Sequence, residues 1–290
     1  MPLRAILAAI IVAICWGGNY TASKFALQDF PPFLLLLMRF TGVTLVLLPF
    51  ALRRPIPNLK HMLVISALLI VVQFALVFFA LHMGLSITGS IIATQLGVPF
   101  SCILAAILFK DYLGPWRSVG LMLAFVGVMI VAGTPNAAEH WDAFLMTVIG
   151  SWSWSSANMY LKTIKQPTTI PLLFWPALFS ILPFLLLTYT AEHGQFEALA
   201  NAHWTSWVGI CYSVIFASLV GYGLWNWLVA HNPMSRVMPW SLLMPVAGIG
   251  IGSFSFGEPL TPRILLGGAL AIAGVGIISL RRPKLAELER

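Results

Sequence analysis

Polar side chains that could bind a solute lie within long apolar runs of this sequence. The first run contains the stretch CWGGNYTASK and carries Asn19, while Gln95, Asn158 and Asn226 have similar apolar surroundings. Because a buried polar group costs free energy unless it is paired, each of these side chains either lines a solute cavity or bonds a neighbouring helix. Both interpretations stay open for the first three. The aromatic residues that flank Asn226 favour a cavity wall there.

Aromatic residues and prolines extend this set. Trp16, Trp154 and Trp240 lie deep in apolar runs beside small or polar residues, which suits indole rings that stack on an apolar or aromatic solute. Pro99 and Pro245 each lack an N–H donor, so each one either kinks a span statically or takes part in transport. The predicted substrate-binding residues are Trp16, Asn19, Phe78, Phe79, His82, Gln95, Pro99, Trp154, Asn158, Tyr222, Trp225, Asn226, Trp240 and Pro245.

Three of these residues have a competing interpretation. Phe78 and Phe79 could face lipid, because aromatic residues gather at membrane interfaces. His82 ends an apolar run, so it belongs either to the outer interface or to a pH-sensing group.

Catalytic and metal chemistry has little support in the sequence. Cys15, Cys102 and Cys211 lie in separate apolar runs without the spacing of a metal site. We find no clustered His/Asp/Glu or Ser/His set of the kind that a membrane-embedded enzyme would need, and no filter motif of a channel. We therefore expect no catalytic residue, no metal and no cofactor, with the enzyme as the less favoured alternative.

The composition predicts an integral membrane protein. Of the 290 residues, 59% are hydrophobic and only 9% are charged, too few to cover the apolar surface of a soluble domain. The net charge of +7 does not indicate nucleic-acid binding, because the basic residues fall singly between apolar runs. The first run lacks a cleavage site and is expected to be retained as a span rather than removed as a signal peptide.

Span length divides the chain further. A helix needs roughly 20 apolar residues to cross the hydrocarbon core. Short separators with turn residues, such as RRPIPN and GEPLTP, divide the chain into ten candidates, and only HMGLSI at 82–87 lacks both proline and charge. The expected spans are 5–27, 33–51, 62–82, 87–109, 117–133, 142–161, 169–190, 204–230, 236–256 and 263–280.

The charges predict the orientation. With the N-terminus inside, 13 of the 16 Lys and Arg residues fall on the cytoplasmic side. The exceptions are Lys24 and Arg263 outside and Arg39 within the second span. Both termini are therefore expected in the cytoplasm. Lys24, Lys162 and Arg39 are interpreted as structural, the lysines near helix ends and Arg39 with a partner that the sequence does not reveal.

An internal repeat links the two halves. At an offset of 138, Trp16 aligns with Trp154 and Lys24 with Lys162. At offsets of 146 to 147, Pro99 meets Pro245, and the acids, phenylalanines and glycines that follow also align. Because five spans per copy is an odd number, the second copy enters from the opposite face. We predict two inverted five-helix repeats, residues 1–138 and 139–290, around a central cavity.

Small residues should bring these spans together. Glycines in membrane helices let neighbouring backbones approach closely. The predicted packing glycines are Gly17, Gly18, Gly120, Gly127, Gly250, Gly252, Gly267, Gly268 and Gly274.

The order of motifs resembles a known family. The W-x7-K span, LLLLMRFTG, the proline spans QLGVPF and LLMPVAG, and the acids of FKDYLGP and FGEPLTP resemble the drug/metabolite transporter superfamily, EamA type. In overall character the chain is similar to YddG-type aromatic amino-acid exporters. The resemblance implies an all-α membrane protein of ten helices that exports small metabolites across the bacterial inner membrane.

The acids bear on energy coupling. All nine lie in loops, at span ends or in the tail, whereas proton-driven exchangers need a carboxylate within the membrane. We expect alternating-access export of amino acids, aromatic ones included, by an uncoupled facilitator. A proton-coupled drug or metabolite antiporter is the alternative. The expected partners are a small-molecule substrate and the lipid bilayer, without nucleic acid, and a monomer suffices.

Overall fold

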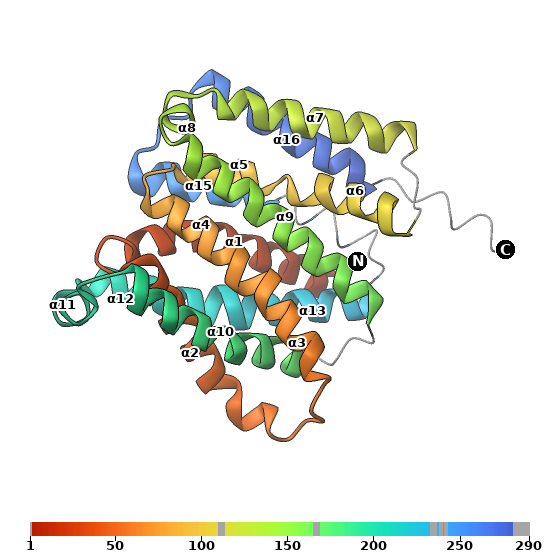
Figure 1. Ribbon diagram of the computed structural model, residues 1–290. Coiled ribbons are helices and arrows are strands. Elements are labelled where there is room, and N and C mark those ends of the chain that lie inside the picture. Colours follow the sequence, from red (N-terminus) through yellow and green to blue (C-terminus); the bar gives the residue numbers. More distant parts are fainter. Residues whose placement is uncertain are drawn as a thin grey trace.

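The computed structural model describes residues 2–109, 114–164, 169–232, 237, 240 and 243–280, and every regular element among them is a helix (Figure 1). The first half contains α1 (Leu3–Ala26), α2 (Pro32–Ala51), α3 (Leu59–Ile65), the π-helix η1 (Ser66–Val72), α4 (Gln73–His82), α5 (Ile87–Thr94), α6 (Gly97–Phe109) and α7 (Pro115–Ala132). The second half contains α8 (Pro135–Glu139), α9 (Trp141–Thr163), α10 (Thr169–Ala191), α11 (Gln195–Asn201), α12 (Trp204–Tyr212), the π-helix η2 (Ser213–Gly221), α13 (Tyr222–His231), α15 (Leu243–Phe256) and α16 (Pro262–Leu280).

Seven helices in the described residues are long and apolar enough to cross a membrane. They are α1, α2, the continuous run α3–η1–α4, the run α5–α6, α7, α10 and the run α12–η2–α13. Helices α15 and α16 are apolar but shorter, and the 23-residue α9 carries the polar stretch SWSWSS. A multi-pass membrane fold is therefore established, while the number of ten spans stays a prediction.

Turn residues separate these helices where the sequence leads us to expect them. Prolines at the first helical position begin α2 and α7. The separator at 82–87 has neither proline nor charge, and the chain turns there at Gly84. The φ angle of Gly84 is +103°, a value that residue types other than glycine rarely adopt. The loop 191–203 contains the short helix α11, which the sequence did not predict.

The helix contacts of the two halves correspond. In the first half, α1 packs on α15 and on the run α12–η2–α13. In the second half, α9 packs on the run α5–α6 and on η1 and α4. The remaining equivalent helices pair with each other, α2 with α10 and α7 with α16, and Figure 1 shows the last pair side by side along one face. This exchange of contacts is what a duplicated fold produces.

Two π-helices occupy corresponding places in the halves. They begin at Ser66 and Ser213, 147 positions apart, close to the offset of the proline spans. π-Helical turns are rare in proteins, and those that do occur often lie at functional sites. The position of η2 matters because Trp16 of α1 and Arg39 of α2 both donate hydrogen bonds to it, as described below.

Glycines set the closest helix contact, between α7 and α16. A Cβ atom built at Gly274 would lie 2.5 Å from the backbone N of Ala124, and one at Gly127 would touch the backbone N of Ala271. The prediction of a packing glycine is therefore confirmed at these positions. It is wrong at Gly250, where a Cβ would meet nothing within 4 Å, because that residue faces outward.

Large apolar side chains also cover the outside of the bundle. Leu45 on α2, Met122 on α7 and Leu182 on α10 are each more than half exposed. A soluble protein rarely shows so much apolar surface, and a lipid environment accounts for it.

Candidate functional site

Trp16 lies at the centre of an aromatic cluster between α1 and α13. Its ring centroid is 5.1 Å from that of Tyr222 and 5.4 Å from that of Trp225. Trp16, Trp225 and Trp240 also pack on one apolar cluster that includes Val12 and Leu228. The indole Nε1 donates a 3.1 Å hydrogen bond to the carbonyl of Ala217, within η2. The structure thus brings Trp16 into contact with Tyr222 and Trp225, two predicted site residues from the other half of the sequence.

Gly221 makes this approach possible. A Cβ atom at Gly221 would lie 2.5 Å from the Trp16 Nε1 atom, so a larger residue would push the indole away from η2. The sequence analysis did not select Gly221. Its signal is the Gly-Tyr-Gly stretch at 221–223, which becomes meaningful only when α1 is known to pack there.

The fourth apolar run breaks in its middle, between α5 and α6. The backbone N–H groups of Gln95, Leu96 and Val98 bond the carbonyls three residues earlier, in place of the regular α-helical pattern. Pro99 explains this local tightening, because it has no N–H to donate to the carbonyl of Gln95. The amide of Gln95 lies at this break and is 8% exposed.

Serines of α9 bind the broken backbone. Ser155 Oγ donates to the carbonyl of Gly97 at 2.6 Å, and Ser151 Oγ reaches the carbonyl of Ala93 at 3.3 Å. Trp154, between them in sequence, lies against Gly97, where a Cβ atom would be 2.9 Å from its ring. The sequence prediction chose the tryptophan but missed both serines, because serine is common in membrane helices.

The candidate amides differ in their bonding. Asn19 is 8% exposed, and its Oδ1 atom has no hydrogen-bond partner. Asn158 donates to the carbonyl of Trp154 in its own helix, and Asn226 is partly buried on α13. Tyr20, the residue after Asn19, bonds Thr94 with 3.1 Å between the hydroxyl oxygens, which joins α1 to the helix break.

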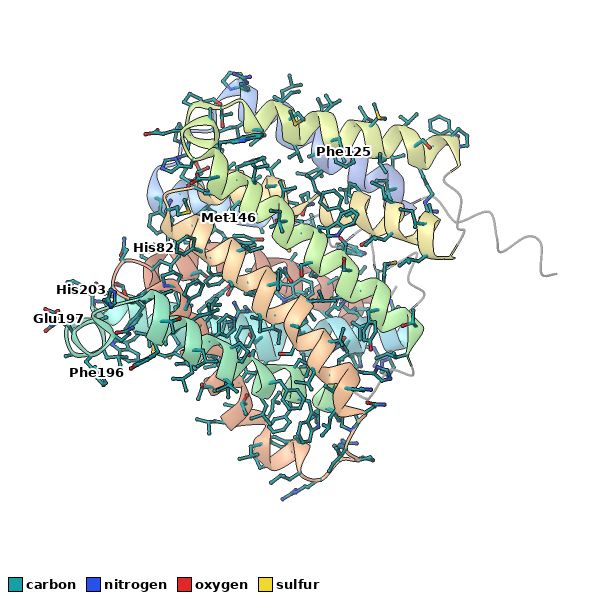
Figure 2. All side chains as sticks on the ribbon, viewed as in Figure 1. His82, Phe125, Met146, Phe196, Glu197 and His203 are labelled. Atoms are coloured by element: carbon teal, nitrogen blue, oxygen red, sulfur yellow. The ribbon has the colours of Figure 1, made fainter. Side chains whose placement is uncertain are left out.

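The remaining predicted residues lie in other places. Phe78 is buried, with the guanidinium of Arg39 5.9 Å from its ring. Phe79 stacks on Phe33, and His82 is exposed at the end of α4, near the end of the bundle that carries His203 in Figure 2. Pro245 is buried in α15, while most of the segment around Trp240 lies outside the described residues.

Three carboxylates cap helix N-termini. Glu192 accepts hydrogen bonds from the backbone N–H groups of Phe33 and Leu34 at the start of α2. Asp29 accepts from the backbone N–H of His203 before α12, at 2.8 Å. Glu258 caps α5 in the same way. Each carboxylate thereby satisfies N–H groups that the helix leaves free and complements its dipole.

Glu258 also pairs with Lys24. The Glu258 carboxylate accepts from the backbone N–H groups of Ile87 and Thr88, and its Oε1 atom lies 3.0 Å from Lys24 Nζ. Burial raises the pKa of this carboxyl, but the two backbone N–H groups and Lys24 outweigh burial, so the pKa lies below its usual 4.5. The sequence analysis interpreted Lys24 as a structural residue near a helix end and did not identify this partner.

Two hollows among the described residues lie away from the predicted site. One of about 390 Å³ lies between Asp29, Pro31 and α11. Another of about 170 Å³ lies beside Ser66 and Pro183. Neither contains a predicted substrate-binding residue, so the central cavity stays a prediction.

The bundle of apolar helices, the broken fourth run and the repeated contacts define a membrane protein of duplicated fold, an architecture that secondary transporters use. Comparison with known families agrees: the model of the EamA-like transporter family matches residues 3–133 and again residues 141–280. The chain belongs to this family, which lies in the drug/metabolite transporter superfamily.

Individual relatives extend over nearly the whole chain. A Salmonella typhimurium protein described as a probable amino-acid metabolite efflux pump is 31% identical over 93% of this chain and 92% of its own. An Escherichia coli protein of the same description is 28% identical with the same coverage. A solved crystal structure that is 16% identical covers 99% of both chains with a TM-score of 0.66, which shows the shared fold.

Proposed function

We propose that this protein exports amino acids, aromatic ones included, across the bacterial inner membrane by alternating access. Membership of the EamA-like family and the described activity of two relatives support an exporter of amino-acid metabolites. The observation that carries the choice of substrate is the cluster of Trp16, Tyr222 and Trp225, in which Trp16 also bonds the π-helical backbone of η2. Aromatic walls of this kind suit a solute with an apolar ring.

The proposed substrate site lies where the broken run α5–α6 meets α1 and α9, and it extends to α13, which packs on α1. A discontinuous helix leaves backbone carbonyls available for a polar solute near the middle of the membrane. In this proposal the buried side chains of Gln95 and Asn19 supply amide groups to the site, and Trp154, which lies against Gly97, forms its wall on the α9 side. The further members are Phe78, Pro99, Asn158, Tyr222, Trp225, Asn226, Trp240 and Pro245. Phe79 and His82 lie toward the end of the bundle and are left out.

The proposed architecture has ten spans, with inverted repeats at 1–138 and 139–290 and both termini in the cytoplasm. The corresponding contacts of α1 and α9 support the repeat, and the charge distribution supports the orientation. In this orientation Asp29, Glu192 and Glu258 cap helices on the outer side. One chain holds both repeats, so we propose that a monomer is sufficient.

Uncoupled transport is part of the proposal. Among the described acids, Asp29, Glu192 and Glu258 are engaged as helix caps, and the lowered pKa of Glu258 keeps this carboxyl ionised at neutral pH. A carrier of protons needs a group that changes its charge during the cycle. Glu258 nevertheless contacts both Lys24 and α5, so it is the carboxylate to examine if transport proves to be proton-coupled.

The test is transport into proteoliposomes of radiolabelled amino acids, with and without an imposed pH gradient. We expect saturable flux of phenylalanine and tryptophan down their gradients and no uphill movement when only protons are supplied. Uphill movement would replace the facilitator by a proton-coupled antiporter, with Glu258→Gln as the diagnostic variant. Absence of amino-acid flux, with flux of another metabolite, would overturn the proposed substrate class.

A further inference from the structure

Arg39 of α2 is the largest fully buried side chain in the described structure, at 2% exposure. Its Nε and Nη2 atoms donate to the hydroxyl of Ser218 at 3.2 and 3.1 Å. Its guanidinium lies 4.7 Å from the ring centre of Phe74 and 5.9 Å from that of Phe78. The residue that lacked a partner in the sequence therefore lies against a serine and aromatic rings.

These contacts leave the charge incompletely compensated. Nη1 is buried without a hydrogen-bond partner, and no carboxylate pairs with Arg39 among the described residues. Arginine stays protonated in proteins, and burying an unpaired charge is costly. A planar guanidinium with a free N–H edge matches a carboxylate, which it can bind through two parallel hydrogen bonds.

The equivalent helix of the second repeat lacks this charge. Pro32 of α2 aligns with Pro171 of α10, an offset of 139, and Phe40 then aligns with Phe179. At the same offset Arg39 aligns with Leu178, so the second repeat forms the equivalent helix with an apolar residue. A charge confined to one of two similar halves points to a ligand rather than to folding.

Arg39 also adjoins the aromatic cluster. Ser218 and Tyr222 are four residues apart where η2 passes into α13, and the Tyr222 phenol lies within electrostatic range of the guanidinium. The Tyr222 ring in turn contacts Trp16. One helical turn, ~5.4 Å, separates the serine level from the aromatic level, on the order of the distance between the carboxylate and the ring of phenylalanine.

We propose that Arg39 binds the carboxylate group of the transported solute, with Ser218 fixing the guanidinium and the Trp16–Tyr222 pair receiving the apolar side chain. This inference rests on the proposed function and narrows its substrates to carboxylates. Amines of the same shape without a carboxylate would lose the interaction that offsets the buried charge.

The experiment compares three probes on the full-length protein in detergent: phenylalanine, phenethylamine, which lacks the carboxylate, and 3-phenylpropionate, which lacks the amine. Affinities are measured by isothermal titration, and each is compared between the native protein and Arg39→Gln. We expect the two carboxylates to lose about tenfold or more in affinity in Arg39→Gln, while phenethylamine is unchanged. Leu178→Gln, the equivalent change in the other repeat, is the matched control and should keep the native order.

A structural role for Arg39 predicts a different outcome. Arg39→Gln would then weaken all three probes equally or none of them, and either result overturns the inference while leaving amino-acid export in place. Binding of phenylpropionate through Arg39 without any flux of phenylalanine would keep the carboxylate site and overturn the proposed substrate. If the native protein binds neither carboxylate probe, the carboxylate site at Arg39 and the proposed amino-acid substrate are both overturned.

Arg39→Lys provides the second variant if the glutamine protein does not fold. Lysine keeps the charge but loses the planar fork, so we expect the preference for carboxylates over phenethylamine to fall several-fold and not to vanish. Ser218→Ala should lower the same preference through the orientation of Arg39. An unchanged preference in both folded variants would overturn the inference.

Discussion

Lys24 Nζ lies 3.0 Å from Glu258 Oε1, and this ion pair connects residues 234 positions apart in the chain. The same carboxylate caps the N-terminus of α5, so one side chain joins α1, α5 and the segment between α15 and α16. Three elements that border the proposed site are thus fixed at one end of the bundle. We expect a carrier that exposes its site to that end to loosen this contact.

Replacement of Glu258 should lower stability in a pH-dependent manner. The pKa of Glu258 is lowered in the folded protein, so its contribution is complete above about pH 4.5 and is lost as the pH falls through the folded-state pKa. We expect Glu258→Gln to cost about 1–3 kcal/mol at neutral pH and less in acid. Thermal unfolding in detergent between pH 3 and 7 measures this difference.

Glu197→Gln is the control, because Glu197 is exposed on α11. It should leave the unfolding temperature unchanged at every pH. A cost of Glu258→Gln that stays constant from pH 3 to 7 would contradict the assignment of the effect to the ionised carboxylate.

The repeat could be inferred from the sequence, but this ion pair could not. Offsets of aligned tryptophans and prolines are read along one chain, whereas contacts between distant helices follow no spacing rule. Lys24 therefore appeared to serve its own helix. Arg39 is the same case, since its partner Ser218 lies on η2 and is an ordinary serine in the sequence.

The site could be predicted only in part for a related reason. Tryptophans and amides in apolar runs are unusual enough to select Trp16 and Gln95, and Pro99 explains the break of the fourth run. Gly221 and Ser155 act through what packs against them, so their residue types alone carry no signal. Gly250 shows the opposite error, because a glycine in a membrane helix does not always mark a contact.

Two glycines give a direct test of helix packing. Gly127→Ala places a methyl group against the backbone of α16, which must move away, and we expect a loss of about 1–3 kcal/mol. Gly250→Ala meets open space and should be neutral or stabilising by up to about 1 kcal/mol, through helix propensity. The unfolding temperatures of both variants, measured in one detergent, test this difference. Equal values for Gly127→Ala and Gly250→Ala would contradict the packing interpretation.

The predicted orientation is open to a reporter experiment. The excess of basic residues on one side predicts that both termini lie in the cytoplasm and that the loop around Gln195 lies outside. Fusions of a compartment-dependent reporter after Gln195 and at Arg290 should report opposite compartments. The same compartment for both would reject the ten-span arrangement.

Substitutions in the proposed site should weaken substrate binding. Trp16→Phe keeps a ring but removes the hydrogen bond to Ala217, and Asn19→Ala and Gln95→Ala remove buried amides. Each lost contact is worth roughly 0.5–2 kcal/mol, a factor of about 2 to 30 in affinity. Trp204→Phe, at a largely exposed residue, is the control. Native affinity in all three site variants would remove α1 and the helix break from the site.

The break at Gln95 should itself affect transport. Pro99→Ala supplies an N–H that can bond the carbonyl of Gln95, so α5 and α6 can join into a regular helix. We expect a higher unfolding temperature and a several-fold slower flux at saturating substrate, because a continuous helix bends less readily. Pro183→Ala, in the interior of α10 and away from the proposed site, controls for removal of a helix proline. If Pro99→Ala transports at the native rate, the break is a static feature that Ser151 and Ser155 maintain through their bonds to the α5–α6 backbone.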